Sequence, residues 1–341
     1  MLCTVSTVRD SLPNVERFVQ GNLANGVDHM FIVLDAPDDQ VETFLNDHPH
    51  VTCLRGDETW WAGRRPPGLN VRQRLNANFV KALLSAFSWA EWIFHIDSDE
   101  VVQVDRSVLA TTPAGVLSAR LAPMEAVSQR QWLDDPTWFK PLLPRNDLAL
   151  LTTLGVLEEP SNMAFFRGHT RGKAGVRPRL DVWVGIHSGL DAQRQPLPAF
   201  TDETLNVLHY ESFSGEEFVR KWKASASAQS PVKFRSARAG TALAVQALLS
   251  KGLSDEMVAS YLMRVYERTS LDDFATLRGL GLLVEVDPSN GSHRPVPFPP
   301  GAHADMMALL DRLAVEPKNA FGPRSPVDAA QRALERAVHS V

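Results

Sequence analysis

The stretch from Trp92 to Glu100 reads WIFHIDSDE, an apolar run that ends abruptly in three carboxylates. A short, almost wholly apolar run is typical of a strand buried on both faces of a parallel sheet. We therefore predict a strand over 92–96, with Asp97 and Asp99 directly beyond its carboxyl end.

The hundred residues around this stretch alternate between strand-like and helix-like patterns. Apolar, β-branched runs predict strands over 2–8, 30–34 and 51–54, and helices are predicted after each of them. Such alternation indicates a Rossmann-like α/β fold, with a mostly parallel mixed sheet covered by helices on both faces. Ligands of these sheets bind beyond the carboxyl ends of the strands, where Thr7, Asp35 and Asp97 stand.

The remaining elements are predicted one by one, and the pattern becomes less regular beyond residue 105. The longest helix is predicted over 70–90, with five residues facing inward: Val71, Leu75, Phe79, Leu83 and Phe87. Further predictions are strands over 115–121, 182–186 and 205–208, loops over 131–181, and helices over 215–225, within 240–283 and from Ser325-Pro326 through Val327, Leu334 and Val338. The predicted domains are a catalytic domain over 1–228, a helical extension over 229–287, a linker over 288–303 and a helical tail over 304–341.

Composition excludes several classes of protein. The 341 residues are 44% hydrophobic and 22% charged with a formal net charge of −5, so the basic excess needed for nucleic-acid binding is missing. The cysteines, Cys3 and Cys53, have no C-x-x-C spacing and are predicted to be buried thiols in a reducing compartment. No signal peptide or 18-residue apolar stretch is recognisable, so we expect a cytoplasmic protein that would meet a membrane only from its surface, at the inner face.

The acidic cluster itself indicates a cation site. Crowded carboxylates raise one another's pKa unless a cation or hydrogen-bond donors compensate. If the backbone stays extended, Asp97 and Asp99 point to one side and suit a hard, oxygen-preferring ion, Mg²⁺ or Mn²⁺, and the small Ser98 leaves the turn uncrowded. The alternative is that the acids form a turn and cap the next helix, and a bare D-x-D favours that alternative.

Context favours the cation site, because the region resembles the D-x-D region of glycosyltransferases with the GT-A fold, closest to family 2-like and family 92-like members. The resemblance covers about residues 2–225 and rests on an ordered series of features. These are the apolar strand ending in I-D-S-D-E, an upstream helix with Arg72, Gln73, Asn76 and Asn78, the stretches 172–178 (GKAGVRP) and 207–210 (VLHY), and Ser212 with 217–221 (EFVRK).

The resemblance implies a nucleotide-sugar donor, usually a UDP-sugar, whose diphosphate is held by a divalent metal while the sugar faces an acceptor hydroxyl. A metal there would neutralise charge as the nucleoside diphosphate leaves. Asp97 and Asp99 would hold it, and His209 matches a histidine that completes the coordination in many such enzymes. The alternative for His209 is an ordinary strand histidine with a satisfied hydrogen bond.

The resemblance also implies nucleotide-binding residues. Its nucleotide-sugar-binding set is Thr7, Arg9, Asp35, Arg72, Asp97, Ser98, Lys173 and Arg177, with the first three at the nucleoside and the last two, in a glycine-containing loop, at the diphosphate. Turn formation before Pro37 is the alternative for Asp35, and a solvated basic loop is the alternative for Lys173 and Arg177.

The catalytic base is the weakest part of the pattern, because the acidic pair of many inverting GT-A enzymes is not found. Glu125 is the candidate, with an exposed loop acid as the alternative, and Glu158, Glu159 and Asp181 are further choices. Inverting and retaining chemistry both stay open. Trp60 and Trp61 would suit sugar stacking, but the core is favoured for the pair.

Two other functions are weighed against the glycosyltransferase. A sugar nucleotidyltransferase would also place paired acids on a metal, but its Gly-rich basic signature is missing after the first strand, where Thr7-Val8-Arg9-Asp10 stands. A GT-A-like binding module without catalysis would explain the missing acidic pair. The acceptor, whether glycan, lipid-linked or protein, is not indicated, and polysaccharide biosynthesis is a family-level expectation only.

Overall fold

The computed structural model describes residues 1–226, 236–322 and 328–339. The chain divides into two compact units, and each unit is made of separated segments. Unit 1 contains Met1–Ala122, Arg171–Val207 and Pro288–Val341, and unit 2 contains Pro123–Thr170 and Leu208–Asp287. The units are described separately, and the predicted domain boundaries after residues 228, 287 and 303 stay predictions.

Unit 1 is built on a twisted mixed sheet in which most neighbouring strands are parallel. Its strand order is β6-β8-β4-β1-β2-β3. The strands are β1 (Leu2–Val8), β2 (His29–Leu34), β3 (Val51–Arg55), β4 (Trp92–His95), β6 (Ser118–Ala126) and β8 (Lys173–Val176). The four strands from β1 to β4 pair in parallel, whereas β8 runs antiparallel to both β4 and β6.

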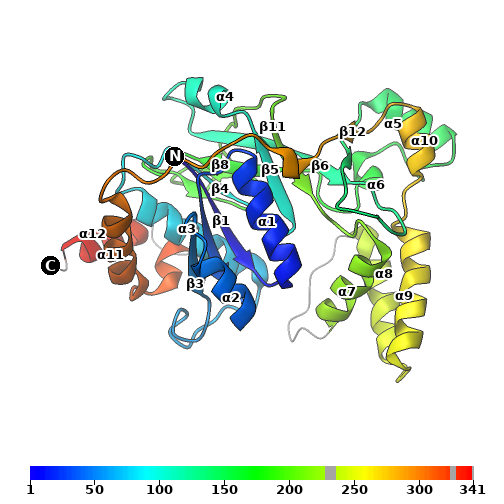
Figure 1. The fold of residues 1–341 in the computed structure, drawn as a ribbon, viewed down its shortest axis with the longest axis horizontal. Helices are drawn as coiled ribbons and strands as arrows, with labels where there is room; N and C mark the ends of the chain where they lie inside the picture. Colours follow the sequence, from blue (N-terminus) through cyan, green and yellow to red (C-terminus); the bar gives the residue numbers. More distant parts are fainter. Residues whose placement is uncertain (227–235, 323–327, 340–341) are drawn as a thin grey trace. The chain divides into compact units, whose positions relative to one another are not determined.

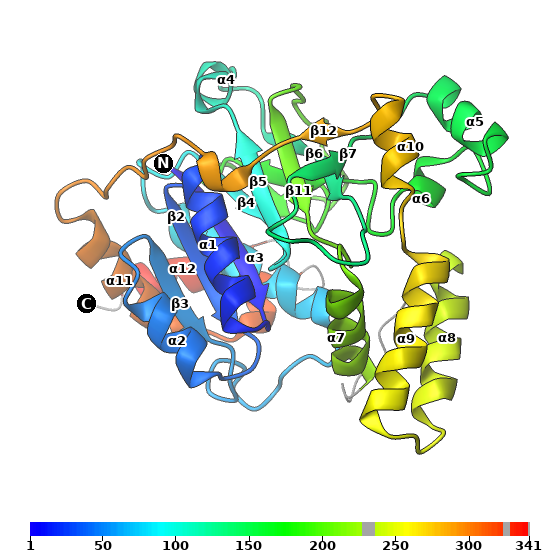
Figure 2. The same ribbon diagram turned by 45° about the vertical axis from the view of Figure 1, so that its right-hand side comes forward.

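Helices cover both faces of this sheet, as the alternating side chains of β2 show. Phe31 and Val33 point into one apolar cluster, and Met30, Ile32 and Leu34 point into the other. The first cluster is shared with α3 (Leu69–Leu84) and the second with α1 (Leu12–Ala24) and α2 (Asp39–Asn46). Figures 1 and 2 show α1 and α2 on one face of the sheet and α3 on the other. The predicted α/β fold class is therefore confirmed.

Helix α3 is shorter than predicted, and in its first turn a different residue faces the core. It ends at Leu84 instead of residue 90, so Phe87 lies beyond it and stacks on Trp89 with ring centroids 5.3 Å apart. Val71 was predicted to face inward, but 37% of it is exposed. The reason is that the neighbouring Arg72 occupies the inward side of that turn, where its side chain is buried in an ion pair.

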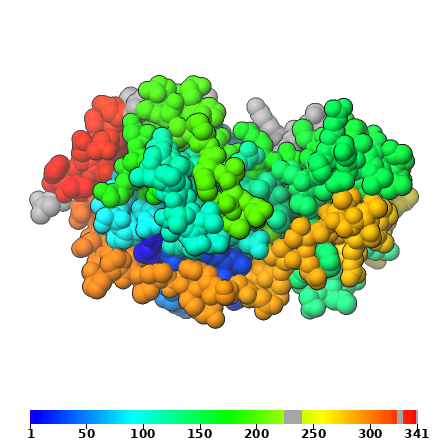
Figure 3. Space-filling view, turned by 90° about the horizontal axis from the view of Figure 1, so that it is seen from above, coloured from blue at the N-terminus to red at the C-terminus, as the bar shows by residue number. Residues whose placement is uncertain are grey.

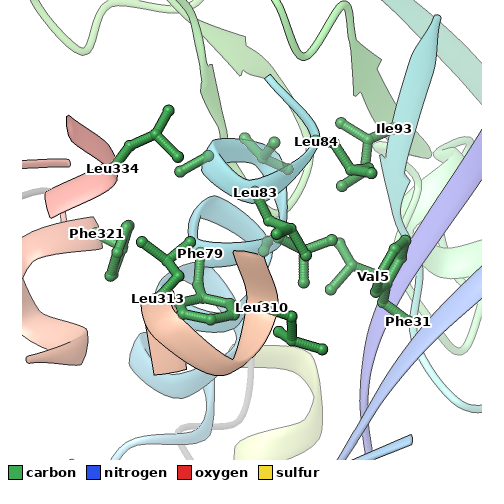
Figure 4. Close-up of a cluster of buried hydrophobic side chains, with 14 of the residues drawn as sticks. Val5, Phe31, Phe79, Leu83, Leu84, Ile93, Leu310, Leu313, Phe321 and Leu334 are labelled. Carbon is green, nitrogen blue, oxygen red and sulfur yellow. The ribbon is translucent and has the colours of Figure 1, made fainter. Parts of the chain in front are cut away.

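The last described elements of the chain close the core over α3. They are α11 (Ala302–Ala314), η2 (Lys318–Phe321) and α12 (Ala329–His339). Leu310, Phe321 and Leu334 pack in one cluster with Phe79 and Leu83 of α3, as Figure 4 shows. The predicted helix start, Ser325-Pro326 with Val327, lies outside the described residues, and Val338 is 41% exposed.

The segment predicted to be a linker, 288–303, is part of unit 1 and packs against its N-terminal part. It includes η1 (Pro288–Asn290), whose Pro288 carbonyl accepts a hydrogen bond from the Asn25 side chain. Further along, the fully buried carboxylate of Asp28 accepts from the backbone N–H of Val296 and lies 3.1 Å from the His293 ring nitrogen. Figure 3 shows the residues after Asp287, in orange, lying beside the blue N-terminal part.

Two short strand pairs and one short helix belong to unit 1 and its borders. They are β5 (Glu100–Val104), which pairs with β11 (Leu205–His209), β9 (Trp183–Val184), which pairs with β10 (Gly189–Leu190), and α4 (Arg106–Thr111). The strand predicted over 182–186 is therefore only two residues long. The strand predicted over 205–208 is confirmed as β11, which also pairs with β6.

Among its described residues, unit 2 has two small apolar clusters. One lies among α5 (Arg145–Thr153), α6 (Asn162–Phe165) and α10 (Phe274–Gly279), beside β7 (Trp138–Lys140) and β12 (Val284–Glu285). The other lies among α7 (Gly215–Ala226), α8 (Ser236–Leu249) and α9 (Asp255–Thr269), which Figure 2 shows side by side.

The loops predicted over 131–181 are a wrong prediction, because this range holds β7, α5, α6 and β8. These elements have three to nine residues, too few for a clear hydrophobic period. Within the described part of the chain, no helix is long and apolar enough to cross a membrane.

Candidate functional site

The acidic stretch forms a tight turn at the carboxyl end of β4. The backbone N–H of Glu100 donates to the carbonyl of Asp97 at 3.2 Å, and the Asp97 N–H donates to the Glu100 carboxylate at 2.8 Å. The extended backbone assumed from the sequence is therefore wrong. Glu100 is the first residue of β5, and its carboxylate accepts the hydrogen bond of the Asp97 N–H. This backbone N–H lies beyond the end of β4, and the turn gives it a hydrogen-bond acceptor.

Lys173 neutralises part of this acidic turn from inside the protein. Its side chain is completely buried on β8, and its ammonium forms ion pairs with Asp97 and with Glu100, the latter at 3.0 Å. Burial alone would lower the pKa of Lys173, but the Asp97 and Glu100 carboxylates raise it by more than burial lowers it. The pKa therefore lies above its ordinary value, and the ammonium is charged at neutral pH. Lys173 was predicted in a glycine-containing loop beside the diphosphate, and its place in a buried strand is a correction.

A glycine two residues along β8 makes this ion pairing sterically feasible. Gly175 lies opposite Phe94 in the antiparallel pairing of β8 with β4. A Cβ atom at Gly175 would lie 2.5 Å from the Phe94 ring, much closer than van der Waals contact allows. The missing side chain therefore lets β8 approach β4, and this approach places Lys173 beside the acidic turn.

The second oxygen of Asp97 is held by helix α3. The Gln73 amide donates to Asp97 Oδ1 at 2.7 Å, while Lys173 donates to Oδ2. Asp97 and Asp99 are both half-buried. The turn gathers three carboxylates, those of Asp97, Asp99 and Glu100, and Lys173 pairs with the first and the last of them. Oxygen-rich groups of this kind are typical ligands of a hard cation.

The end of β2 carries a second, fully ion-paired carboxylate. Arg72 donates to Asp35 through Nε at 2.7 Å and through Nη2 at 2.6 Å, and Arg65 lies 3.0 Å from the same carboxylate. Burial tends to raise the pKa of Asp35, but the hydrogen bonds and charge of Arg72 and Arg65 lower it below the ordinary value. Asp35 is therefore ionised at neutral pH and its two oxygens face guanidinium groups.

The end of β1 is tied to α3 by neutral hydrogen bonds. The Asn76 amide donates to the Thr7 hydroxyl at 2.9 Å and its oxygen accepts from the Trp60 indole at 3.0 Å. Trp60 and Trp61 are 7% and 4% exposed, so the core position favoured for this pair is confirmed. Arg9, just beyond β1, is exposed.

Arg177 follows β8 and is engaged with neighbouring backbone. Its guanidinium donates to the carbonyls of Val116 and Thr112 at 3.1 and 2.9 Å and lies 4.5 Å from the Trp92 ring centroid. These contacts rule out the solvated loop considered for it. A diphosphate contact by Arg177 stays a prediction, as does one by Ser98, which is half-buried between the two aspartates.

In unit 2, the candidate base Glu125 lies on β6 and is completely buried. Its carboxylate is 3.0 Å from the Lys140 ammonium and accepts the backbone N–H groups of Arg167, at 2.6 Å, and Gly168. Burial tends to raise the pKa of Glu125, but Lys140, His209 and these N–H groups lower it. The exposed loop acid considered from the sequence is therefore wrong, and these contacts make Glu125 a weak proton acceptor.

His209 ends β11 beside a second histidine that was not predicted. The His209 and His169 rings are nearly parallel, at 19°, with centroids 4.9 Å apart, and His209 Nε2 lies 3.8 Å from the Glu211 carboxylate. A Cβ atom at Gly168 would lie 2.3 Å from the His209 ring. Only glycine fits there, so the backbone before His169 can lie directly against His209.

No family model and no curated protein matches this sequence. Several solved structures are partly similar. The bifunctional glycosyltransferase WbbM is 16% identical with a TM-score of 0.25, and the match covers 52% of this chain but only 31% of WbbM. HddC from Yersinia pseudotuberculosis is 10% identical with a TM-score of 0.30, over 61% of this chain and 93% of HddC.

A third similar structure is UDP-glucose pyrophosphorylase in complex with UDP-glucose. It is 12% identical with a TM-score of 0.26, over 52% of this chain and 76% of that one. Likenesses of this extent carry no argument about function. The fold class rests on the strand order and pairing described above, and the function has to be argued from the residues.

The residue types in the two units suit different roles. Unit 1 places Asp97, Asp99, Asp35 and Arg72 around the carboxyl ends of its strands, where carboxylates can bind a hard cation. Unit 2 carries His209, which can bind a metal through a ring nitrogen. These donors are the ones that Mn²⁺ uses, and carboxylates alone suit Mg²⁺. The other base candidates, Glu158, Glu159 and Asp181, are exposed.

Proposed function

We propose that this protein is a glycosyltransferase that moves a sugar from a nucleotide-diphosphate sugar, of the UDP class, to an acceptor hydroxyl. The observation that carries the proposal is the acidic turn at the carboxyl end of β4, which gathers three carboxylates, two of them paired with the buried Lys173. A divalent metal, Mn²⁺ or Mg²⁺, would bind these oxygen ligands and the donor diphosphate together.

Asp97 and Asp99 are the residues proposed to hold the metal. A carboxylate offers about four lone-pair positions, so Asp97 can bind a cation while Lys173 and Gln73 each occupy one position. The metal would act as a Lewis acid and withdraw charge from the diphosphate as it leaves. His209, which belongs to unit 2, is a further proposed ligand on the strength of the sequence resemblance alone.

The donor side of the proposal uses the ends of β1 and β2. Thr7, Arg9 and Asp35 are proposed at the nucleoside, with Arg72 holding Asp35 in one orientation through its two hydrogen bonds. Lys173 is fully buried, so in this proposal it orients Asp97 and does not contact phosphate directly. Arg177 and Ser98 stay proposed diphosphate contacts.

The acceptor side is less defined. Glu125 stays the sequence-based candidate for the base that deprotonates the acceptor hydroxyl, although its ion pair with Lys140 argues against strong basicity. The acceptor is proposed as a glycan, a lipid-linked molecule or a protein, with polysaccharide biosynthesis at the cytoplasmic membrane surface as the setting.

A sugar nucleotidyltransferase is the second candidate, because it too would place the acidic turn on a metal. The two activities differ in their products. A nucleotidyltransferase releases pyrophosphate from a nucleoside triphosphate and a sugar 1-phosphate, whereas a glycosyltransferase releases a nucleoside diphosphate from the finished donor. A binding module would bind a nucleotide sugar and release neither.

The first experiment measures thermal stability with UDP-, GDP-, CMP- and dTDP-linked sugars, with Mn²⁺ or with EDTA. A ligand at one hundred times its Kd stabilises the native state by about 2.7 kcal/mol. We expect one nucleotide class to raise the melting temperature only when Mn²⁺ is present. A shift that persists in EDTA contradicts the metal site, and no shift with any donor contradicts the proposed function.

Variants then test the residues. Asp99→Ala should remove the metal-dependent shift and leave the melting temperature of the ligand-free protein close to that of the wild type. Asp134→Ala, which removes an exposed carboxylate in unit 2, is the matched control and should keep the full shift. An unchanged shift in Asp99→Ala would show that the acidic turn is not the metal site.

A further inference from the structure

Three buried side chains of unit 1 form a series of hydrogen bonds that ends near the carboxyl end of β1. The Trp60 indole donates through Nε1 to Asn76 Oδ1 at 3.0 Å, and Asn76 Nδ2 donates to the Thr7 hydroxyl oxygen at 2.9 Å. Thr7 stands at the edge of the sheet where ligands of parallel sheets bind. The series therefore connects the loop that carries Trp60 with the place proposed for the donor nucleoside.

The direction of these hydrogen bonds is fixed by the indole. An indole N–H donates and cannot accept, so the oxygen of the Asn76 amide has to face Trp60. The NH₂ group of Asn76 then faces Thr7, and the Thr7 oxygen is the acceptor. The Thr7 hydroxyl keeps its own proton, and among the described residues this proton has no acceptor. Thr7 is therefore a donor that a ligand can satisfy.

The Trp60 ring is held from two directions, so its N–H keeps pointing at Asn76. The buried Lys318 ammonium lies 4.2 Å from the centroid of the ring and donates to the backbone carbonyls of Ala314 and Glu316. The Phe79 ring meets Trp60 edge-on, with centroids 4.8 Å apart. Indole is the aromatic side chain that attracts a cation most strongly, and an edge-on pair is a preferred arrangement.

We propose that the Thr7 hydroxyl, directed by Trp60 through Asn76, recognises the oxygen at position 4 of the donor's pyrimidine base. Uracil and thymine carry a carbonyl oxygen there, which accepts a hydrogen bond, whereas cytosine carries an amino group, which donates. The carbonyl gives the Thr7 proton an acceptor, but the amino group leaves this proton unpaired in a buried place. The donor is then a uridine or thymidine diphosphate sugar, and Trp60 and Asn76 are positioning residues.

This inference rests on the proposed function, because it names the base that Thr7 selects at the proposed nucleoside site. The test compares the Kd values of UDP and CDP, measured by calorimetry with the full-length protein and Mn²⁺. The two nucleotides share ribose and diphosphate, so the ratio of their Kd values cancels changes in metal or phosphate binding. We expect the wild type to bind UDP about tenfold or more tightly than CDP.

The first variants remove and restore the hydroxyl. Thr7→Val has nearly the same shape without the hydroxyl, and its preference for UDP should fall below about threefold. Thr7→Ser keeps a hydroxyl and should retain the preference. Melting temperatures of the ligand-free variants show whether each is folded.

Two tryptophan variants separate the direction of the hydrogen bond from packing. Trp60→Phe keeps an aromatic ring but removes the N–H, so the Asn76 amide can turn and accept from Thr7. The preference for UDP should then fall below about threefold. Trp61→Phe is the matched control, because the Trp61 indole donates to the Gly56 carbonyl at 3.1 Å and not to Asn76. It should keep the wild-type preference.

Asn76→Asp gives a result that a purely structural role would not produce. A carboxylate only accepts, so it would accept from Trp60 and also take the proton of Thr7. The Thr7 lone pairs would then face the ligand, and the preference should shift toward CDP. If this buried charge prevents folding, the pair Trp60→Phe and Trp61→Phe decides.

Two outcomes would overturn the inference and leave the glycosyltransferase proposal standing. One is equal affinity of the wild type for UDP and CDP, and the other is a preference for UDP that Trp60→Phe leaves unchanged. Binding of neither nucleotide in the presence of Mn²⁺ would contradict the proposed function and the inference together.

Discussion

Replacing Lys173 by methionine tests the central electrostatic argument about unit 1. The change keeps the length of the side chain and removes the ammonium that faces Asp97 and Glu100. Glu100 is fully buried, so water cannot replace the lost partner, whereas the Asp97 side chain is 28% exposed. Removing one partner of a buried ion pair typically costs about 3–5 kcal/mol. We expect a loss in this range.

The assay is urea and thermal unfolding at pH 8, followed by tryptophan fluorescence. The double variant Glu100→Gln with Lys173→Met is the control, and it should recover most of the lost stability because, of the two partners of Lys173, only the partly exposed Asp97 stays charged. A loss below about 1 kcal/mol at pH 8, as for an exposed ion pair, would refute the reasoning.

Three further predictions concern packing and burial. Gly168→Ala should cost about 1–3 kcal/mol, measured by urea unfolding, because its Cβ atom would overlap the His209 ring. Burial lowers the pKa of His29 to about 3, so the folded protein keeps this ring neutral while the unfolded chain takes up a proton below about pH 6.5. The free energy of unfolding should therefore fall on acidification, by about 2 kcal/mol at pH 5 from this residue. Stability curves of His29→Gln should therefore fall less steeply between pH 7 and pH 5 than those of the wild type, and equal slopes would contradict this. Phe321→Ala should lower stability by about 3–5 kcal/mol, and a melting temperature equal to that of the wild type would show that η2 does not close the core.

The strands of unit 1 could be predicted from the sequence because each is an uninterrupted apolar run. The runs at 2–8, 30–34 and 92–96 became β1, β2 and β4 to within one residue at each end. Strands buried on both faces need apolar residues at every position, and few other structures produce such a pattern. The carboxyl-terminal positions of Asp35 and Asp97 followed from the same runs.

The ion pairs of the candidate site could not be predicted in this way. Lys173 meets Asp97 only because a four-residue antiparallel strand, β8, pairs with β4 from far along the chain. Neither the length of that strand nor its composition, KAGV, distinguishes it from a loop. Lys140 and Glu125 likewise meet through the pairing of β7 with β6. Pairing between distant short strands depends on tertiary packing, which local patterns do not contain.

The closing of the core over α3 has a consequence for synthesis of the protein. Phe79 and Leu83 leave the ribosome more than two hundred residues before Leu310, Phe321 and Leu334, which cover them in the finished fold. At about 5–20 residues per second, this face of α3 waits uncovered for about ten to fifty seconds. During that interval the nascent chain presents a ready binding surface for chaperones. A fragment that stops near residue 228 would keep that surface exposed permanently.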